Sequence, residues 1–402
     1  MSGTVRPLRI GVFFGEALAA PESVWSLRDA GHDVVVFVRT GSRPASTAIR
    51  GIAVAGIHPP ESDLARCRAD MQEMIRRCSL DLLLPLDDVA LLVSSSTHLG
   101  APVAGPRGPQ LDLALDKQQQ IAAADAAGLS IPPSVVIEGP GHVDWDRSFP
   151  VVVKPADAVQ VDADRVRKGP TWICGDREEL ERVCSSVPVG VPYLVQQHIT
   201  GEGRGLFGLA MGDDVFEWSG HRRLRMMNPA GSGSSACAPV DVPDELRESV
   251  RRLLRAVGWE GIFMIELLVD AQGRTWFMEL NGRAWGSMAL ARRRGFEYPA
   301  WAVATALDPS FRPQRLPGHE VTACRNLAYE LLHLLFVVRG PQTSGDVAWP
   351  SIVSTLRELL RVRRSHRLYN SRRGERRVLR RDVIWTVRRV VGSRSGRPTP
   401  HR

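Results

Sequence analysis

Short apolar segments alternate with helix-like stretches in the first quarter of the chain, and this pattern restricts the fold more than any other feature. An amphipathic stretch about Pro21 to Ala30, closed by Gly31, separates the first two apolar segments. Runs of this length are typical of buried parallel strands, which need helical crossovers between them. We therefore predict an α/β domain over residues 1–112, with strands in LRIGVFFG from Leu8, DVVVFVR from Asp33, DLLLPL from Asp81 and PVAGP from Pro102.

The glycines of this region exclude a nicotinamide-binding fingerprint, because GVFFGE lacks the GxGxxG spacing that brings a backbone against a pyrophosphate. The chain has 402 residues, of which 44% are apolar and 24% charged, as in globular proteins of two or three domains. Its six cysteines form no CxxC pair, which argues against structural zinc and disulfides and favours the cytoplasm. No apolar run approaches the roughly 18 residues of a membrane span.

A second unit, residues 113–305, mixes helices with hairpin-like strand pairs and indicates an α+β arrangement. We expect helices in DKQQQIAAADAAGL from Asp116 and about Asp244 to Val257, a loop over 156–170, and a turn in TGEGRG. Strands are expected in IPPSVVI, FPVVVKP, YLVQQHI, the pair within LFGLAMGDDVFEWSG, GIFMIELLVD and TWFMELNG.

Two of these strands carry acids that would share one face. Glu279 and Asn281 lie two residues apart, so they point to the same side of a strand, and the neighbouring strand would bring Glu266 opposite them. Carboxylate and amide oxygens suit Mg²⁺. The competing interpretation is an edge hairpin whose acids face water.

Lysine is rare in this arginine-rich chain, and its positions are informative. Of 52 basic residues only Lys117, Lys154 and Lys168 are lysine. Lys117 opens a helix and Lys154 ends a buried strand, where a compact ammonium charge would reach phosphate oxygens. Lys168 follows in a loop beside Gly169, and we interpret it as solvated.

In this order the residues resemble the ATP-grasp superfamily, and the resemblance extends from about residue 8 to 305. It implies a Rossmann-like pre-ATP-grasp domain followed by a two-lobed ATP-grasp domain. By this resemblance Lys117 and Lys154 bind the nucleotide phosphates, and Glu266, Glu279 and Asn281 bind Mg²⁺ or Mn²⁺. Arg283, within MELNGRAWGS, would stabilise the transferring phosphate, so Arg283 and Lys154 are the expected catalytic residues.

The same resemblance assigns YLVQQHITGEG to the nucleoside. Gln196 would receive the adenine amine, the main chain around Gln197 and Ile199 would bind the ring edge, and Glu202 would contact ribose. Two features depart from the family pattern. The flap PADAVQVDADRVRKG has glycine only at 169, and Gly282 replaces the usual proline, which we interpret as added backbone freedom before Arg283.

The activity that the resemblance implies is ATP-dependent activation of a small carboxylate as an acyl phosphate, with release of ADP and attack by an amine. Activation of bicarbonate or carbamate ranks lower, because the chain shows no biotin-carrier lysine motif and no glutaminase unit. A nucleotide-binding module without turnover is the third alternative. Arg223 or Arg225 would supply a further cation or end a solvated strand, and Ser287 would cap a helix or bind phosphate.

The extension from 306 to 402 carries the basic charge. After Trp349 sixteen arginines face three acids, a net charge of +13, whereas the preceding residues sum to −5. LRELLRVRR and RDVIWTVRRVV have helical spacing, and packing against the body or a solvated face is the leading interpretation. Contact with an anionic membrane surface is the main alternative, while nucleic-acid binding lacks any recognisable motif. We expect the last ten residues to be disordered, and a homodimer stays open.

Overall fold

The structure is a computed structural model that describes residues 7–95, 99–231, 233–341 and 349–392. The expected disorder of the last ten residues therefore lies outside the described residues. The N-terminal part confirms the α/β expectation: its strands pair in parallel in the order β3-β2-β1-β4. They are β1 (Arg9–Phe13), β2 (Asp33–Arg39), β3 (Ala53–Ile57) and β4 (Leu82–Pro85). The helical segments are α1 (Ala20–Asp29), η1 (Ala45–Ala48), α2 (Leu64–Cys78), α3 (Asp88–Ser95) and α4 (Pro109–Leu115).

The prediction for PVAGP was wrong, because this segment forms an isolated bridge between Val103 and Leu83 instead of a strand. The sequence interpretation also missed β3 and α2. The helix α2 is capped by Asp63, whose carboxylate accepts a hydrogen bond from the amide of Arg66, and it buries Cys67 and Met71 against the sheet.

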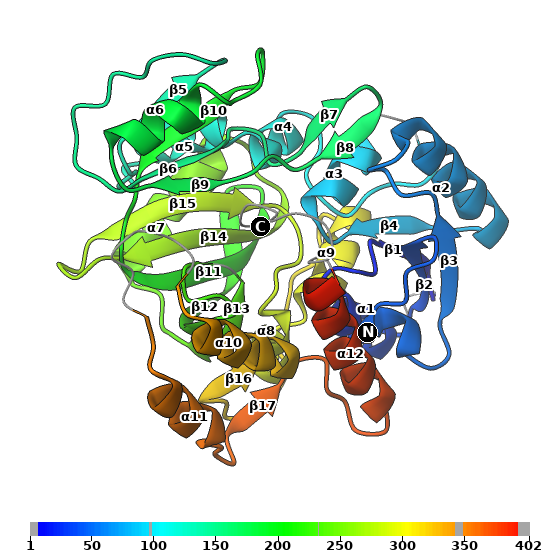
Figure 1. Ribbon diagram of the computed structural model, residues 1–402. Helices are drawn as coiled ribbons and strands as arrows, with labels where there is room; N and C mark the ends of the chain where they lie inside the picture. Colours follow the sequence, from blue (N-terminus) through cyan, green and yellow to red (C-terminus); the bar gives the residue numbers. More distant parts are fainter. Residues whose placement is uncertain (1–6, 96–98, 232, 342–348, 393–402) are drawn as a thin grey trace.

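A small antiparallel sheet follows, in the order β5-β10-β6-β9. Its strands are β5 (Ser134–Ile137), β6 (Val151–Pro155), β9 (Trp172–Cys174) and β10 (Tyr193–Gln197), with helix α6 (Arg177–Cys184) on one face. Helix α5 (Lys117–Ala126) precedes this lobe. In Figure 1 the lobe lies above the large sheet.

The large sheet has the order β15-β14-β11-β12-β13-β16-β17. One face packs against α5 and α7, and the other packs against α8, α9 and the N-terminal domain. The expected turn TGEGRG was wrong: β11 already begins at Glu202, because pairing with β14 extends through these glycines. The elements are β11 (Glu202–Met211), β12 (Asp214–Met226), β13 (Ser234–Pro239), α7 (Asp244–Ala256), β14 (Gly261–Val269), β15 (Thr275–Asn281), α8 (Met288–Arg293), α9 (Tyr298–Leu307), β16 (Ala323–Arg325) and β17 (His366–Leu368).

The expected flap loop, residues 156–170, contains the hairpin β7 (Gln160–Asp162) and β8 (Arg165–Arg167). Val159 and Val166 are buried in the core of the N-terminal domain. The amide of Leu64 donates to the carbonyl of Asp164 at 2.8 Å, which fixes the hairpin turn to the start of α2. The flap is therefore held by apolar side chains and β pairing, and not by a glycine-rich backbone.

The C-terminal helices are α10 (Leu327–Arg339), α11 (Ile352–Leu360) and α12 (Arg376–Gly392). Figure 1 shows α12, in red, against the N-terminal domain. There Val378 is fully buried, and Trp25 Nε1 donates to Glu375 Oε1 at 3.2 Å. No helix within the described residues has both the length and the apolar character of a membrane span. The domain boundaries at 112 and 305 stay predictions.

We predict that Val378→Ala lowers the free energy of unfolding by about 2 kcal/mol, because it removes buried methyl groups from the contact between α12 and the N-terminal domain. Urea denaturation measures this change. Val353→Ala is the matched control, since Val353 is 66% exposed and its truncation is expected to alter stability by less than about 0.5 kcal/mol. Equal effects of the two substitutions would contradict the docking of α12.

Candidate active site

The two expected acidic strands pair directly. In the antiparallel register of β14 and β15, Glu266 lies opposite Glu279 and Met264 opposite Asn281. Asn281 is 3% exposed, and its Nδ2 has no hydrogen-bond partner among the described residues. Glu266 and Glu279 are half-buried, so the acids of this edge strand pair are partly withdrawn from water.

Gln120 fixes this end of β15 to helix α5. Its amide nitrogen donates to the carbonyl of Leu280 at 3.0 Å, and its Oε1 accepts from the amide of Leu280 at 2.9 Å. The side chain is 2% exposed and also bonds the carbonyls of Leu113 and Ala114. Because Leu280 lies between Glu279 and Asn281, Gln120 positions both of them relative to Lys117 on the same helix.

The two lysines come from separate elements. Asp116 caps α5 by accepting from the amides of Gln118 and Gln119, and the amide of Lys117 donates to the carbonyl of Ala156 at 3.0 Å. Lys154 lies near the end of β6, and its Nζ donates to Gln196 Oε1 at 2.9 Å. Burial lowers the pKa of Lys154 to about 8, with a further decrease from the charge of Lys117. Glu279 and Glu266 oppose this decrease, so all four charges act within one site.

Glu279 is the electrostatic centre of the cluster. Burial raises the pKa of its carboxyl group, Lys117 lowers that pKa, and Glu266 raises it again. Arg223 Nη2 donates to Glu266 Oε2 at 2.7 Å, so Arg223 is at the site. Arg225 instead pairs with Glu330 and Glu358, away from these acids.

Arg283 is held by a carboxylate that the sequence interpretation did not single out. Its Nε donates to Asp88 Oδ1 at 2.8 Å and its Nη2 to Asp88 Oδ2 at 3.3 Å. Lys168 Nζ lies 3.6 Å from Asp88 Oδ2 while 44% of its side chain is exposed, so it is solvated as expected and also forms an ion pair that the sequence did not indicate. Asp88 follows the parallel strand β4, and the carboxyl edge of such a sheet was the available signal, since ligands bind there.

The residues expected to bind the nucleoside are differently engaged. Gln196 is buried, and its amide donates to Ser134 Oγ at 2.9 Å while its oxygen accepts from Lys154. Gln197 donates through its side chain to the carbonyl of Pro150, and Ile199 is half-buried beyond the end of β10. Glu202 accepts hydrogen bonds from Arg204 and Arg222. The predicted adenine and ribose contacts stay predictions.

Two further interpretations change with the structure. Gly282 is required by packing, because a Cβ there would lie 2.8 Å from Pro106 Cγ and from Trp259 Cζ2. Ser287 precedes α8 without a capping hydrogen bond, and its buried hydroxyl has no partner within the described part of the chain. The expectation of a Ser287 cap was therefore wrong.

The residues present fit a magnesium ion. Glu266 and Glu279 face each other across one strand pair, and Asn281 shares the face of Glu279, so carboxylate and amide oxygens can converge on one ion. Oxygen donors of this kind match the preference of Mg²⁺, which completes its coordination with water and phosphate oxygens. The described residues contain no group of three or more His, Cys, Asp or Glu side chains placed to hold a metal ion.

Comparisons with known proteins agree with this geometry. The structure superimposes on the L-amino acid ligase of Bacillus licheniformis with a TM-score of 0.59 and 18% identity, covering 77% of this chain and 78% of that one. The biotin carboxylase domain of a 2-oxoglutarate carboxylase of Hydrogenobacter thermophilus, solved with MgADP and bicarbonate, gives a TM-score of 0.57 at 15% identity, covering 77% and 71%. The chain has the ATP-grasp fold.

Sequence comparison of this ATP-grasp chain gives a weaker likeness. No protein-family model matches it. A D-alanine–D-alanine ligase of Chromohalobacter salexigens is 24% identical over 202 residues, which cover 46% of this chain. The match spans 60% of the length of that relative.

Asp88 leads to a pH-dependent prediction. Burial alone would raise its pKa, but Arg283 and Lys168 outweigh burial and hold the pKa at about 2. An acid with a lowered native pKa stabilises the fold above its unfolded value of about 4 and loses this effect as the pH falls through about 2. We expect Asp88→Asn to cost about 2 kcal/mol at neutral pH, with the difference from wild type shrinking between about pH 4 and 2.

Urea denaturation at a series of pH values tests this expectation. Asp213→Asn, which removes an exposed carboxylate in the turn between β11 and β12, is the control. It is expected to leave the loss of stability between about pH 4 and 2 unchanged. A constant difference between wild type and Asp88→Asn across this range would show that Asp88 does not carry the paired charge.

Proposed function

We propose that the protein is an ATP-dependent ligase that activates a small carboxylate as an acyl phosphate, releases ADP and transfers the acyl group to an amine. The observation that carries the proposal is the mutual electrostatic influence of Lys117, Lys154, Glu266 and Glu279 at one place, although they lie far apart in the chain. A triphosphate beside a carboxylate needs this combination of cations and metal-binding oxygens.

Each side chain has a role set by its position. Lys117 and Lys154 would bind phosphate oxygens as point charges, and Arg283, oriented by Asp88, would face the transferring phosphate. Arg223 would neutralise charge beside Glu266. Glu266, Glu279 and Asn281 would hold Mg²⁺, whose charge would offset the negative charge of the phosphates. The protein's own contribution is positioning, since Asp88 holds Arg283 and Gln120 holds the main chain between Glu279 and Asn281.

The similar proteins support a ligase that acts on amino acids more directly than one that acts on bicarbonate. An L-amino acid ligase and a D-alanine–D-alanine ligase are among them, whereas the biotin carboxylase domain was solved with bicarbonate. Amino acids are therefore the first carboxylate substrates to test, and bicarbonate is tested separately. A cytoplasmic location and a homodimer remain part of the proposal.

Only one helix of the arginine-rich extension is a candidate for contact with a membrane. Because α12 packs against the N-terminal domain, the remaining amphipathic helix is α11, where Val353 and Leu360 are 66% and 79% exposed beside Arg357 and Arg361. We propose α11 as the part that would meet an anionic membrane surface.

ADP release tests the ligase proposal. With ATP and Mg²⁺, ADP formation is expected to rise when pools of carboxylic amino acids are added, and Glu279→Gln is expected to lower kcat by about 10²-fold because a metal-binding charge is lost. Glu248→Gln, an exposed acid of α7, is the matched control. If no acid stimulates ADP formation, a nucleotide-binding module without turnover is favoured. If bicarbonate alone stimulates it, an enzyme that activates bicarbonate is favoured.

The lowered pKa of Lys154 predicts proton uptake on nucleotide binding. Above pH 8 this lysine is largely neutral, and phosphate oxygens favour its ammonium form. Calorimetry in two buffers of different ionisation enthalpy should therefore show more proton uptake at about pH 8.5 than at about pH 6.5. Lys154→Met should remove this difference. Equal proton uptake by the wild type and Lys154→Met would show that Lys154 does not bind the phosphates.

A further inference from the structure

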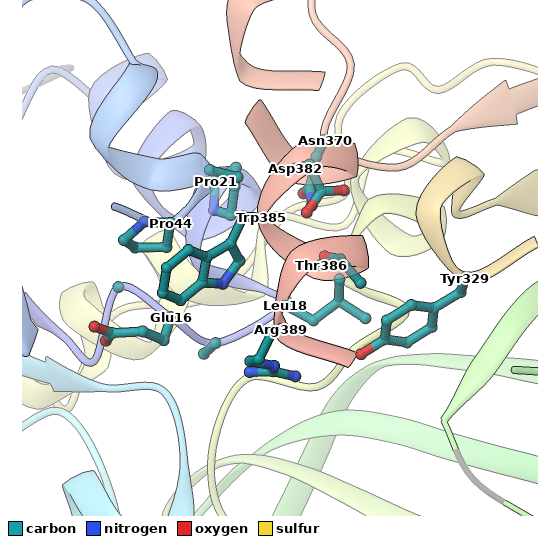
Figure 2. Close-up of a pocket in the computed structure, with 13 residues that line it drawn as sticks. Glu16, Leu18, Pro21, Pro44, Tyr329, Asn370, Asp382, Trp385, Thr386 and Arg389 are labelled. Carbon is teal, nitrogen blue, oxygen red and sulfur yellow. The ribbon is translucent and has the colours of Figure 1, made fainter. Parts of the chain in front are cut away.

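A small polar cavity lies between α12 and the loop that follows β1 (Figure 2), and the proposed phosphate chemistry does not use it. Its volume is about 50 Å³. The N-terminal loop contributes Glu16 and Leu18, α10 contributes Tyr329, and the segment before α12 contributes Asn370. The cavity therefore joins the first strand of the chain to its last helix.

One face of α12 forms a wall of this cavity. Asp382, Trp385, Thr386 and Arg389 follow the spacing of consecutive helical turns, so their side chains project from the same side. Figure 2 shows these side chains between the Glu16 loop and Tyr329. Within an extension rich in arginine, Asp382 places a carboxylate at the inner end of this face.

Several buried polar atoms of the cavity lack hydrogen bonds. Asp382 is 5% exposed and Asn370 is 1% exposed. Asp382 Oδ2 has no partner in the described structure, and neither have Asn370 Oδ1 and Nδ2 or Trp385 Nε1. Buried polar atoms in proteins are nearly always bonded, so these open acceptors and donors call for a polar group from outside the chain.

The charge of the cavity favours a cation at its inner end. Burial raises the pKa of Asp382 to about 6, and the amide of Asn370 offsets part of the rise, so the carboxylate is mostly ionised at neutral pH. Glu16, the other acid of the lining, is already engaged by the amide and guanidinium of Arg39 and by Ser42. A primary ammonium group brings a positive charge beside Asp382 and three N–H donors for the open oxygens of Asp382 and Asn370.

The volume limits what enters. A water-sized group needs about 10–15 Å³ on this measure, so the cavity holds roughly three or four heavy atoms. That suits the aminomethyl end of a small amine and excludes a nucleotide. The exposed guanidinium of Arg389 stands at the outer end of the same helix face.

The cavity also borders the loop that carries Arg283. A Cβ added to Gly286 would lie 3.2 Å from Leu18 Cδ2, so the lining residue Leu18 contacts the segment three residues after Arg283. Arg39, which binds Glu16, also feels the charge of Asp87, the neighbour of Asp88. Both routes connect the cavity to the carboxyl edge of the parallel sheet, where Asp88 holds Arg283.

We propose that this cavity binds the ammonium head of the amine substrate and that Asp382, supplied by the C-terminal helix, is its anchor. The identification of the ligand as a substrate rests on the proposed ligase function, whereas binding of the amine does not. The arginine-rich extension thereby acquires a role in substrate recognition.

Binding without ATP tests the cavity by itself. Calorimetry with glycinamide as the probe should detect binding to the wild-type chain, and Asp382→Asn should weaken it at least about tenfold, because a charge-assisted contact is lost. Arg388→Gln, on the exposed side of α12, is the matched control and should bind as wild type does. Leu18→Phe should also reduce binding, since it fills the cavity from the opposite wall, and it gives a second test should Asp382→Asn unfold.

Unchanged glycinamide affinity in both Asp382→Asn and Leu18→Phe would overturn the proposal, as would binding of acetate in place of glycinamide.

Kinetic measurements distinguish this proposal from the proposed ligase function. If an amine stimulates ADP release, Asp382→Asn should raise its KM at least about tenfold and alter the KM for ATP less than about twofold. If Asp382→Asn loses amine binding but the wild-type protein shows no turnover, the amine site is supported and the ligase function is contradicted. If turnover occurs and Asp382→Asn leaves the KM for the amine unchanged, the ligase function is supported and the amine site is contradicted.

Discussion

The pairing of Arg283 with the buried carboxylate of Asp88 is the contact on which the arrangement of the site depends. Asp88 follows a strand of the N-terminal domain, Arg283 follows the acidic strand pair, and Lys168 ends the flap hairpin. Three parts of the chain therefore meet at one side chain. An arginine held in this way is oriented before any ligand arrives, which in the proposed function spares the cost of ordering a mobile cation for phosphoryl transfer.

The positions of Lys117, Lys154, Glu279 and Asn281 were predictable because each depends on local rules. A helix start, a strand end and the two-residue period of a strand determine where these side chains point. Asp88 and Lys168 were missed because their pairing joins distant segments, and no local spacing encodes it. The turn assigned to TGEGRG failed for a related reason: its glycines suggest a loop, yet pairing with β14 places them in a strand.

The segment 156–170 shows how apolar anchoring changes the physical character of a flap. A glycine-rich loop would close over phosphates through mobile backbone amides, whereas here Val159 and Val166 are anchored in the N-terminal core. In the proposed function, ordering such a segment would cost little on nucleotide binding, because its conformational entropy has already been lost on folding. Opening it for release would require that two buried valines leave their contacts. The hairpin is therefore less mobile than a glycine-rich loop, and its conformation is fixed in advance.

The bond between Trp25 and Glu375 closes a loop of 350 residues, which makes the final helix a structural element of the first domain. Domains generally fold from the N-terminus onward during synthesis. On the ribosome, the parallel sheet would therefore form with the flank of α1 uncovered until residues 376–392 had emerged. A nascent chain interrupted before that helix would leave exposed the apolar surface that Val378 covers.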